Sequence, residues 1–114
     1  MTTFNERERA FEAKYAHDEE FRFLVTARRD KLVAAWLANR LHLDQDARVA
    51  LTASALAVRD GAGHDSLLLD HLMHAVRHRS GEVSTKEIEA ALETCAVQAK
   101  QQLLSLPVAA AAPA

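Results

Sequence analysis

The chain has 114 residues, of which 49% are hydrophobic and 26% are charged, and its formal net charge is −2. This length and composition predict one folded domain with a single hydrophobic core, and they exclude an intrinsically disordered chain. The small negative net charge gives no general attraction to nucleic acid or to an anionic membrane surface. With three glycines and two prolines, and with alanine, leucine, glutamate and arginine abundant, the chain is predicted to be all-α.

The first segment, residues 1–17, is called the arm here and predicts a short, highly charged helix. A capping-box pattern begins at Thr3, and Phe4, Phe11 and Tyr15 fall on one narrow stripe of that helix. Three aromatic side chains are too few to form a core, but they suit docking on another protein. Because isolated helices shorter than about 12–15 residues are marginal in water, the free arm is expected to be helical or partly disordered.

Residues 18–106 predict a four-helix bundle, which follows the arm directly. Asp18 caps the first helix of the bundle, which is predicted to run to about Arg40. The apolar face of this helix is predicted to consist of Phe21, Leu24, Val25, Leu32, Ala35 and Trp36.

Cap signals and glycines divide the rest of the bundle into three more helices. The second begins after Asp44 and ends at the glycines of residues 59–63, and the third begins at Asp65 or Ser66. The fourth begins with a capping box at Ser84 and ends at a proline, after which residues 107–114 form an alanine- and proline-rich tail that is expected to be disordered. The predicted inward positions are Val49, Ala53, Leu56 and Ala57 in the second helix, Leu69, Leu72, Met73 and Val76 in the third, and Ile88, Leu92, Cys95, Ala99 and Leu103 in the fourth.

Histidines on the third helix are the candidates for a metal site. His71, His74 and His78 share one face, His64 lies in the loop before it, and histidines at i and i+4 are good metal ligands. That face points away from the apolar one, and Arg77 and Arg79 beside it would repel a cation. A solvated surface is therefore the preferred interpretation, and a metal-binding bundle stays open as an alternative.

Motifs for catalysis are not found. A bundle that holds a di-metal site needs Glu-x-x-His pairs, and the chain has none; nor does it have a phosphate-binding glycine loop. We therefore expect neither catalysis nor a cofactor. The lone Cys95 is interpreted as a buried structural thiol. No secretory signal and no apolar run of membrane-spanning length is visible, which predicts a cytoplasmic protein without direct membrane insertion.

The first third of the chain carries a dense pattern of residues at fixed spacing. The positions are Phe4, Arg7, Ala10, Phe11, Glu12, Lys14, Tyr15, His17, Asp18, Glu19 and Glu20, followed by Phe23, Ala27, Arg28, Arg29 and Trp36. With this pattern the chain resembles the zeta subunits of alpha-proteobacterial F-type ATP synthases, a family of ATPase inhibitors. Members of that family carry a run of the form F-x-x-R-x-x-A-F-E-x-K-F/Y-x-H-D-E-E, followed by F-x-x-x-A-R-R and a tryptophan. Beyond Trp36 the resemblance is one of pattern and length only.

The resemblance implies that the arm wedges into a catalytic interface of the ATP synthase head and blocks ATP hydrolysis, while the bundle limits insertion. The protein would then be cytoplasmic and peripheral at the inner membrane, held there through the synthase, with no nucleic acid as partner. Arg28 and Arg29 either pair with nearby carboxylates, or orient the arm against the body, or contact the partner. An adaptor without inhibitory activity stays open as an alternative. The implied partner-binding residues are Phe4, Arg7, Ala10, Phe11, Glu12, Lys14, Tyr15, Asp18 and Glu19.

Overall fold

Four α-helices and no strand make up the part of the chain that the computed structural model describes, which is residues 6, 9 and 19–105. The all-α prediction and the number of helices in the bundle are confirmed. The tail and the arm lie outside the described residues, apart from Glu6 and Arg9, which are helical and exposed. The helices are α2 (Glu19–Arg40), α3 (Gln45–Leu56), α4 (His64–His78) and α5 (Thr85–Leu104).

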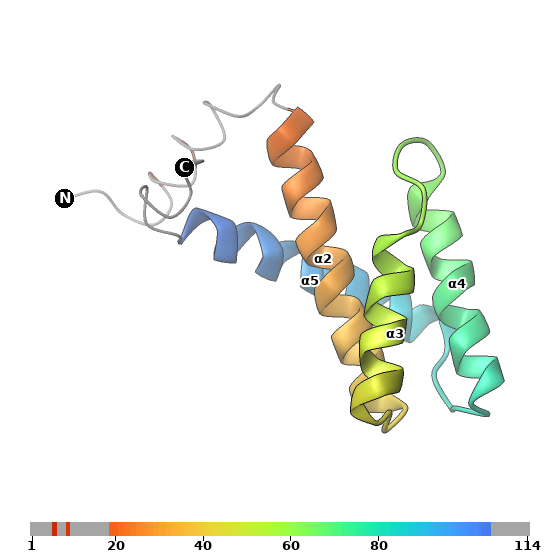
Figure 1. Ribbon diagram of the computed structural model, residues 1–114. Coiled ribbons are helices and arrows are strands. Elements are labelled where there is room, and N and C mark those ends of the chain that lie inside the picture. Colours follow the sequence, from red (N-terminus) through yellow and green to blue (C-terminus); the bar gives the residue numbers. More distant parts are fainter. Residues whose placement is uncertain (1–5, 7–8, 10–18, 106–114) are drawn as a thin grey trace.

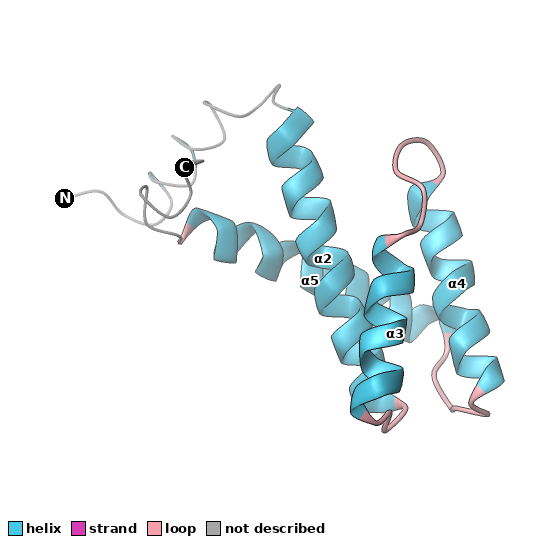
Figure 2. Cartoon of the chain, viewed as in Figure 1, coloured by secondary structure: helices cyan, strands magenta, loops and turns pink. Residues whose placement is uncertain are grey.

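The central element is α2, which packs mainly against α5 and α3. In Figure 1, α3 lies beside the C-terminal half of α2, α4 lies beyond α3, and α5 crosses behind α2. The helices account for nearly all of this body, and only short loops join them (Figure 2). The N-terminal half of α2 therefore extends past α3 and α4, away from the place where all four helices meet.

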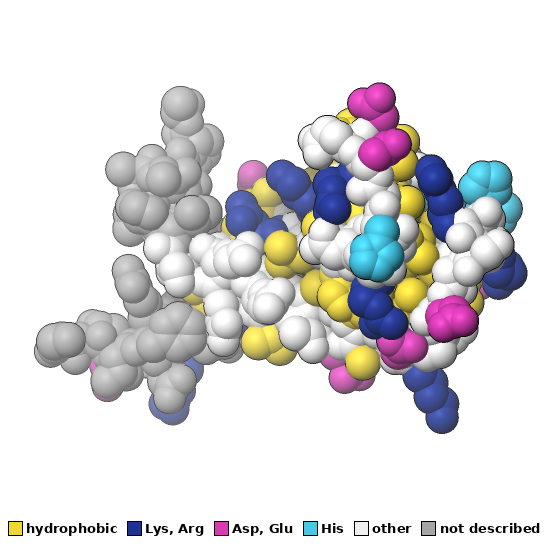
Figure 3. Space-filling view, turned by 90° about the horizontal axis from the view of Figure 1, so that it is seen from below, with side chains coloured by type: hydrophobic (Ala, Val, Ile, Leu, Met, Phe, Trp, Pro, Cys, Tyr) yellow, Lys and Arg dark blue, Asp and Glu magenta, His cyan; other side chains and the backbone are white. Residues whose placement is uncertain are grey.

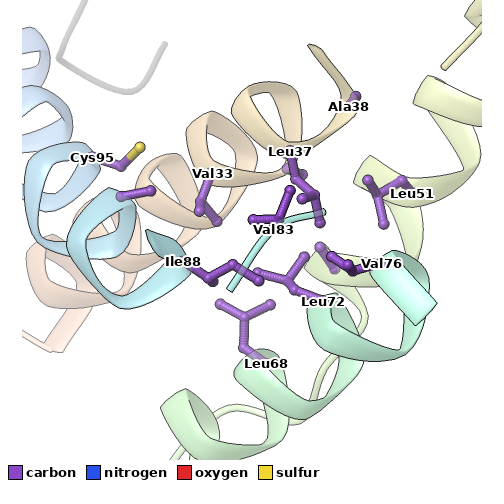
Figure 4. Packing of buried hydrophobic residues seen from close by; sticks show 13 residues of the cluster. Val33, Leu37, Ala38, Leu51, Leu68, Leu72, Val76, Val83, Ile88 and Cys95 are labelled. Carbon is purple, nitrogen blue, oxygen red and sulfur yellow. The ribbon is translucent and has the colours of Figure 1, made fainter. Parts of the chain in front are cut away.

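The hydrophobic core lies where α5 crosses the C-terminal half of α2. Leu37 of α2, Leu72 of α4 and Ile88 of α5 are fully buried and point toward one another (Figure 4). Burying a side chain of this size contributes about 1.5–3 kcal/mol to folding. The whole cluster consists of Val33, Ala34, Leu37, Ala38, Leu51, Ala55, Leu68, Leu72, Val76, Val83, Ile88, Ala91 and Cys95.

Two predicted helix starts are confirmed by their side-chain caps. The Asp44 carboxylate accepts a hydrogen bond of 2.8 Å from the backbone N–H of Ala47 at the start of α3. At the start of α5, the N–H of Glu87 donates to the Ser84 hydroxyl at 3.1 Å, and the N–H of Ser84 donates to the Glu87 carboxylate at 3.2 Å. Each cap satisfies N–H groups that have no partner within the helix.

The connection between α3 and α4 differs from the prediction. Instead of continuing to the glycines, α3 ends at Leu56, and α4 begins at His64, one or two residues earlier than expected. Gly63, with φ of 81°, takes the left-handed conformation immediately before His64. This turn lets α4 start early because glycine adopts that conformation without strain.

The buried face of α2 was predicted wrongly. The buried positions are Asp30, Val33, Ala34, Leu37 and Ala38, because this stripe faces the place where the other three helices meet. Leu32 and Trp36, which were predicted to be inward, pack at the edge of the core. Phe21, Leu24 and Val25 belong to the projecting half of the helix, and Leu24 is exposed.

The buried face of α3 was also predicted wrongly, because this helix carries two apolar stripes. Leu51 and Ala55 are buried in the core, whereas the predicted residues all lie exposed. Val49 is 56% exposed and Leu56 is 47% exposed. The four exposed residues are Val49, Ala53, Leu56 and Ala57.

The inward faces of α4 and α5 are close to the prediction. Leu72, Val76, Ile88, Cys95 and Ala99 are buried as expected. The partly buried Leu69, Met73 and Leu92 pack against the core, as predicted, and the burial of Leu68, Ala91 and Leu104 was not foreseen. At the end of α5, Leu104 is the buried leucine in place of Leu103, which is only half-buried.

Candidate functional site

The structure describes the chain continuously from Glu19, so the N-terminal half of α2 is the helical segment that follows the arm. Its side chains from Glu19 to Arg29 are exposed or half-buried, and the first buried residue is Asp30. Glu19 pairs with Arg22 at 3.5 Å, but both are well exposed, and such surface pairs add little stability. Eight of the predicted partner-binding residues lie outside the described residues, namely Phe4, Arg7, Ala10, Phe11, Glu12, Lys14, Tyr15 and Asp18.

Asp30 is a buried carboxylate at the base of this segment. It lies in line with the core residues Val33 and Ala34 and is only 2% exposed. An ionised group in such a place needs partners, because burial removes its hydration. One oxygen accepts from the guanidinium of Arg29 at 2.9 Å, and the other contacts Nε2 of His64 at 2.6 Å.

His64, the first residue of α4, is 8% exposed and has an acceptor at each ring nitrogen. Besides the contact of Nε2 with Asp30, Nδ1 lies 2.8 Å from the backbone carbonyl oxygen of Arg59. A carbonyl oxygen and a carboxylate both accept, so the geometry favours a proton on each nitrogen. Burial lowers the pKa of His64, but the bonds to Arg59 and Asp30 outweigh burial and the repulsion from Arg29, so the pKa is raised.

Arg29 joins this buried pair to the surface. Its guanidinium donates to both oxygens of Asp65, at 2.8 and 3.3 Å, in addition to its contact with Asp30. Burial alone would lower the pKa of Arg29, but the two carboxylates raise it, and the bond from Arg29 lowers the pKa of Asp65. Asp65 itself is largely exposed, with 70% of its side chain in solvent.

These four residues, Arg29, Asp30, His64 and Asp65, are called the ion-pair cluster below. The cluster directly connects two adjacent residues of α2 with two adjacent residues of α4, and the carbonyl of Arg59 in the loop that follows α3 contacts His64. No buried side-chain nitrogen or oxygen in the described part of the chain lacks a hydrogen-bond partner. The arrangement therefore fixes the position and rotation of the projecting half of α2 relative to the body.

The adjacent Arg28 holds α2 at a second place, because its guanidinium donates to the side-chain oxygen of Gln102 on α5 at 3.1 Å. Within the described part of the chain, Arg29 thus binds nearby carboxylates, as the first of the alternatives for this pair predicts, whereas Arg28 binds a neutral amide. The grouping of Asp30, His64 and Asp65 was not predicted from the sequence. The one signal in the sequence was the position of Asp30, because it lies on the same helix face as the apolar Val33 and Ala34. That face proves to be the buried stripe, where a carboxylate needs a partner.

A shallow hollow lies beside the cluster, between α2 and the loop that joins α3 to α4. Its volume is about 290 Å³, and Phe23, Thr26 and His64 are among the residues that line it. Glu19, Arg22, Asp60 and Asp65 give its lining charges of both signs. This mixture offers no strong selectivity for a small anion or cation, so the hollow itself is not assigned a ligand.

The candidate metal histidines lie elsewhere, along α4. His71 forms a hydrogen bond of 2.8 Å with the Ser54 hydroxyl, and the rings of His74 and His78 stack with their centroids 6.4 Å apart. His74 and His78 are exposed, as the surface interpretation predicted. Among the described residues, no three histidine, cysteine or acidic side chains are grouped so that they could hold a metal ion.

Charge is mixed over the surface seen in Figure 3, where lysine and arginine side chains alternate with acidic ones and hydrophobic side chains lie between them. This face thus presents no extended basic patch of the kind that binds nucleic-acid phosphates. None of the described helices is both long enough and apolar enough to cross a membrane.

A comparison of the sequence with models of known protein families gives a match that covers both the arm and the body. The family model described as ATPase inhibitor subunit zeta matches residues 1–102, which include the arm, α2, α3, α4 and most of α5. No curated protein and no solved structure matches the chain. Because the family match covers all but the last 12 of the 114 residues, the chain belongs to the ATPase inhibitor subunit zeta family.

Proposed function

We propose that this protein inhibits the F-type ATP synthase by inserting its arm into a catalytic interface of the synthase head, which blocks ATP hydrolysis. The observation that supports this most is the family match, because it begins at residue 1 and so includes the arm together with the bundle. Binding to the head would hold the protein at the cytoplasmic side of the inner membrane without inserting into the bilayer.

The body supplies a fixed support for the arm. The arm leads into α2 at Glu19, and α2 is 22 residues long, which corresponds to about 33 Å. The ion-pair cluster and the Arg28–Gln102 hydrogen bond hold this helix against α4 and α5. An arm that becomes helical on binding would extend this support, so the bundle would limit how far the arm inserts.

The aromatic side chains of the arm supply part of the free energy that specific binding needs. Burying the three aromatic side chains, Phe4, Phe11 and Tyr15, yields about 1.5–3 kcal/mol each. Ordering a disordered segment costs about 2–5 kcal/mol, so contacts from charged residues such as Arg7 and Lys14 are needed as well. This is recognition of a groove by an amphipathic helix.

The test is ATP hydrolysis by the purified cognate head in the presence of the full-length chain. Replacing Phe4, Phe11 and Tyr15 together with alanine should abolish inhibition, because the apolar anchor is lost. Leu67→Ala is the matched control, since Leu67 is an exposed apolar residue on α4 and its loss should leave inhibition intact.

The outcomes distinguish the inhibitor from an adaptor. A triple variant that inhibits as well as the wild type would refute insertion by the arm. A wild-type chain that binds the head without slowing hydrolysis would be an adaptor, and one that does not bind the head would refute the proposed function altogether.

A further inference from the structure

A groove runs between the outward faces of α2 and α3. It has a volume of about 510 Å³, and its lining includes Ala35 from α2 and Val49, Ala53 and Leu56 from α3. Alanines in a groove allow the backbone of a third helix to approach closely. From residue 48 to residue 56 of α3 the groove is roughly 12 Å long, which accommodates about two turns of a docked helix.

The apolar stripe along this groove takes no part in the packing of the four described helices. Val49, Ala53 and Leu56 follow the i, i+4, i+7 spacing of one helix face, yet all three are exposed, while the opposite stripe of Leu51 and Ala55 enters the core. Single exposed apolar residues are ordinary, but a helical stripe of them beside a groove is typical of a protein-binding surface.

The charged side chains that line the groove have one sign. Lys31 and Arg48 line it, and no acidic residue does. Neither cation forms an ion pair within the described part of the chain. An occupant with carboxylates beside an apolar stripe would complement both the shape and the charge of the groove.

We propose that the α2/α3 groove binds an amphipathic helix of the ATP synthase head that carries acidic residues along the edges of its apolar stripe. This inference rests on the proposed function and adds to it a second contact, made by the body instead of the arm. The arm then stops hydrolysis, and the groove contributes affinity and orientation. Groove and arm should consequently be separable by mutation.

The first experiment measures the dissociation constant of full-length variants for the purified cognate head, together with the inhibition reached at saturation. The double variant Val49→Ser and Leu56→Ser should bind about tenfold or more weakly, since two apolar side chains no longer leave water. Inhibition at saturation should remain complete because the arm is unchanged. Val97→Ser is the matched control, since Val97 lies on α5 and is 57% exposed.

The second pair of variants tests the charge of the occupant. Lys31→Glu combined with Arg48→Glu should weaken binding and make it less sensitive to salt, because the attraction to carboxylates becomes repulsion. Lys86→Glu, on an exposed position of α5, is the control for a change of net charge. Urea unfolding midpoints of all variants show whether a loss of affinity comes from unfolding.

A photo-crosslinker placed at Ala53 identifies the occupant directly. Crosslinking to an acidic amphipathic helix of the head, absent when the crosslinker is at Val97, would support the proposal. Crosslinking to a second copy of the chain or to its own arm would overturn it. If the wild type binds and inhibits while the groove variants bind equally well, the groove proposal alone fails; if the wild type does not bind the head, the proposed function fails and the groove proposal with it.

Discussion

Replacing Asp30 with asparagine should destabilise the protein more than any surface substitution. The new side chain has nearly the same shape, so the core around it is not disturbed. Its amide nitrogen, however, places a donor where the carboxylate accepts from Arg29 and His64. One of these buried donors then loses its acceptor, and the carboxylate that compensates the charge of His64 is lost.

The expected loss follows from the burial of the pair. Removing one partner of a buried ion pair costs about 3–5 kcal/mol because the other charge is left uncompensated. Arg29 retains Asp65, and the Arg59 carbonyl still accepts from His64, so the lower end of that range applies, about 3 kcal/mol. This is a large share of the about 5–15 kcal/mol that stabilises a typical domain.

Urea unfolding followed by far-ultraviolet circular dichroism measures this loss. Asp65→Asn is the matched control, because it removes a carboxylate from the same Arg29 at an exposed position and should cost about 1 kcal/mol or less. Combining Asp30→Asn with His64→Gln should cost less than the sum of the two single changes, since the residues are in contact. Equal losses for Asp30→Asn and Asp65→Asn would refute the argument that burial makes the cluster important.

Four further predictions follow from the same structure. The folded-state pKa of His64 is raised, so the contribution of its protonated form to stability is complete below about pH 6.5. This contribution is lost as pH rises through the folded-state pKa. Thermal melts of the wild type should therefore show a decrease in Tm with rising pH that the His64→Gln variant lacks. Leu72→Ala should cost about 2–5 kcal/mol in urea unfolding, because Leu72 is fully buried at the centre of the core. Ser84→Ala should cost about 1 kcal/mol in the same assay, since it removes one half of the capping box at α5. Alkylation of Cys95 should be far slower in the native protein than in urea, because burial covers the thiol and raises its pKa.

Local signals in the sequence were sufficient for the number of helices in the bundle and for the caps at Asp44 and Ser84. Asp44 and Ser84 act on N–H groups within three residues of themselves, so their roles can be predicted without knowing the fold. The same holds for the face of α5, where Ile88, Cys95 and Ala99 form one dominant apolar stripe.

The buried faces of α2 and α3 depend on how the helices are arranged in space. α3 has two apolar stripes of similar strength, and only its position against α2 and α4 determines that Leu51 enters the core while Val49 does not. The ion-pair cluster could not be predicted from the sequence for a similar reason. Asp30 needed a buried cation, and the sequence offers six histidines and 14 lysines and arginines without indicating that His64, 34 residues away, is the one.

The projection of α2 beyond the core implies a gradient of stability along a single helix. Backbone amides near Leu37 can exchange with solvent only when the body unfolds, whereas those near Glu19 need only a local opening of the first turns. The ion-pair cluster at Arg29 and Asp30 marks the boundary between these two regimes. Fraying that starts at the first turn of α2 can therefore travel two to three turns along this helix and stop there, which leaves the bundle intact.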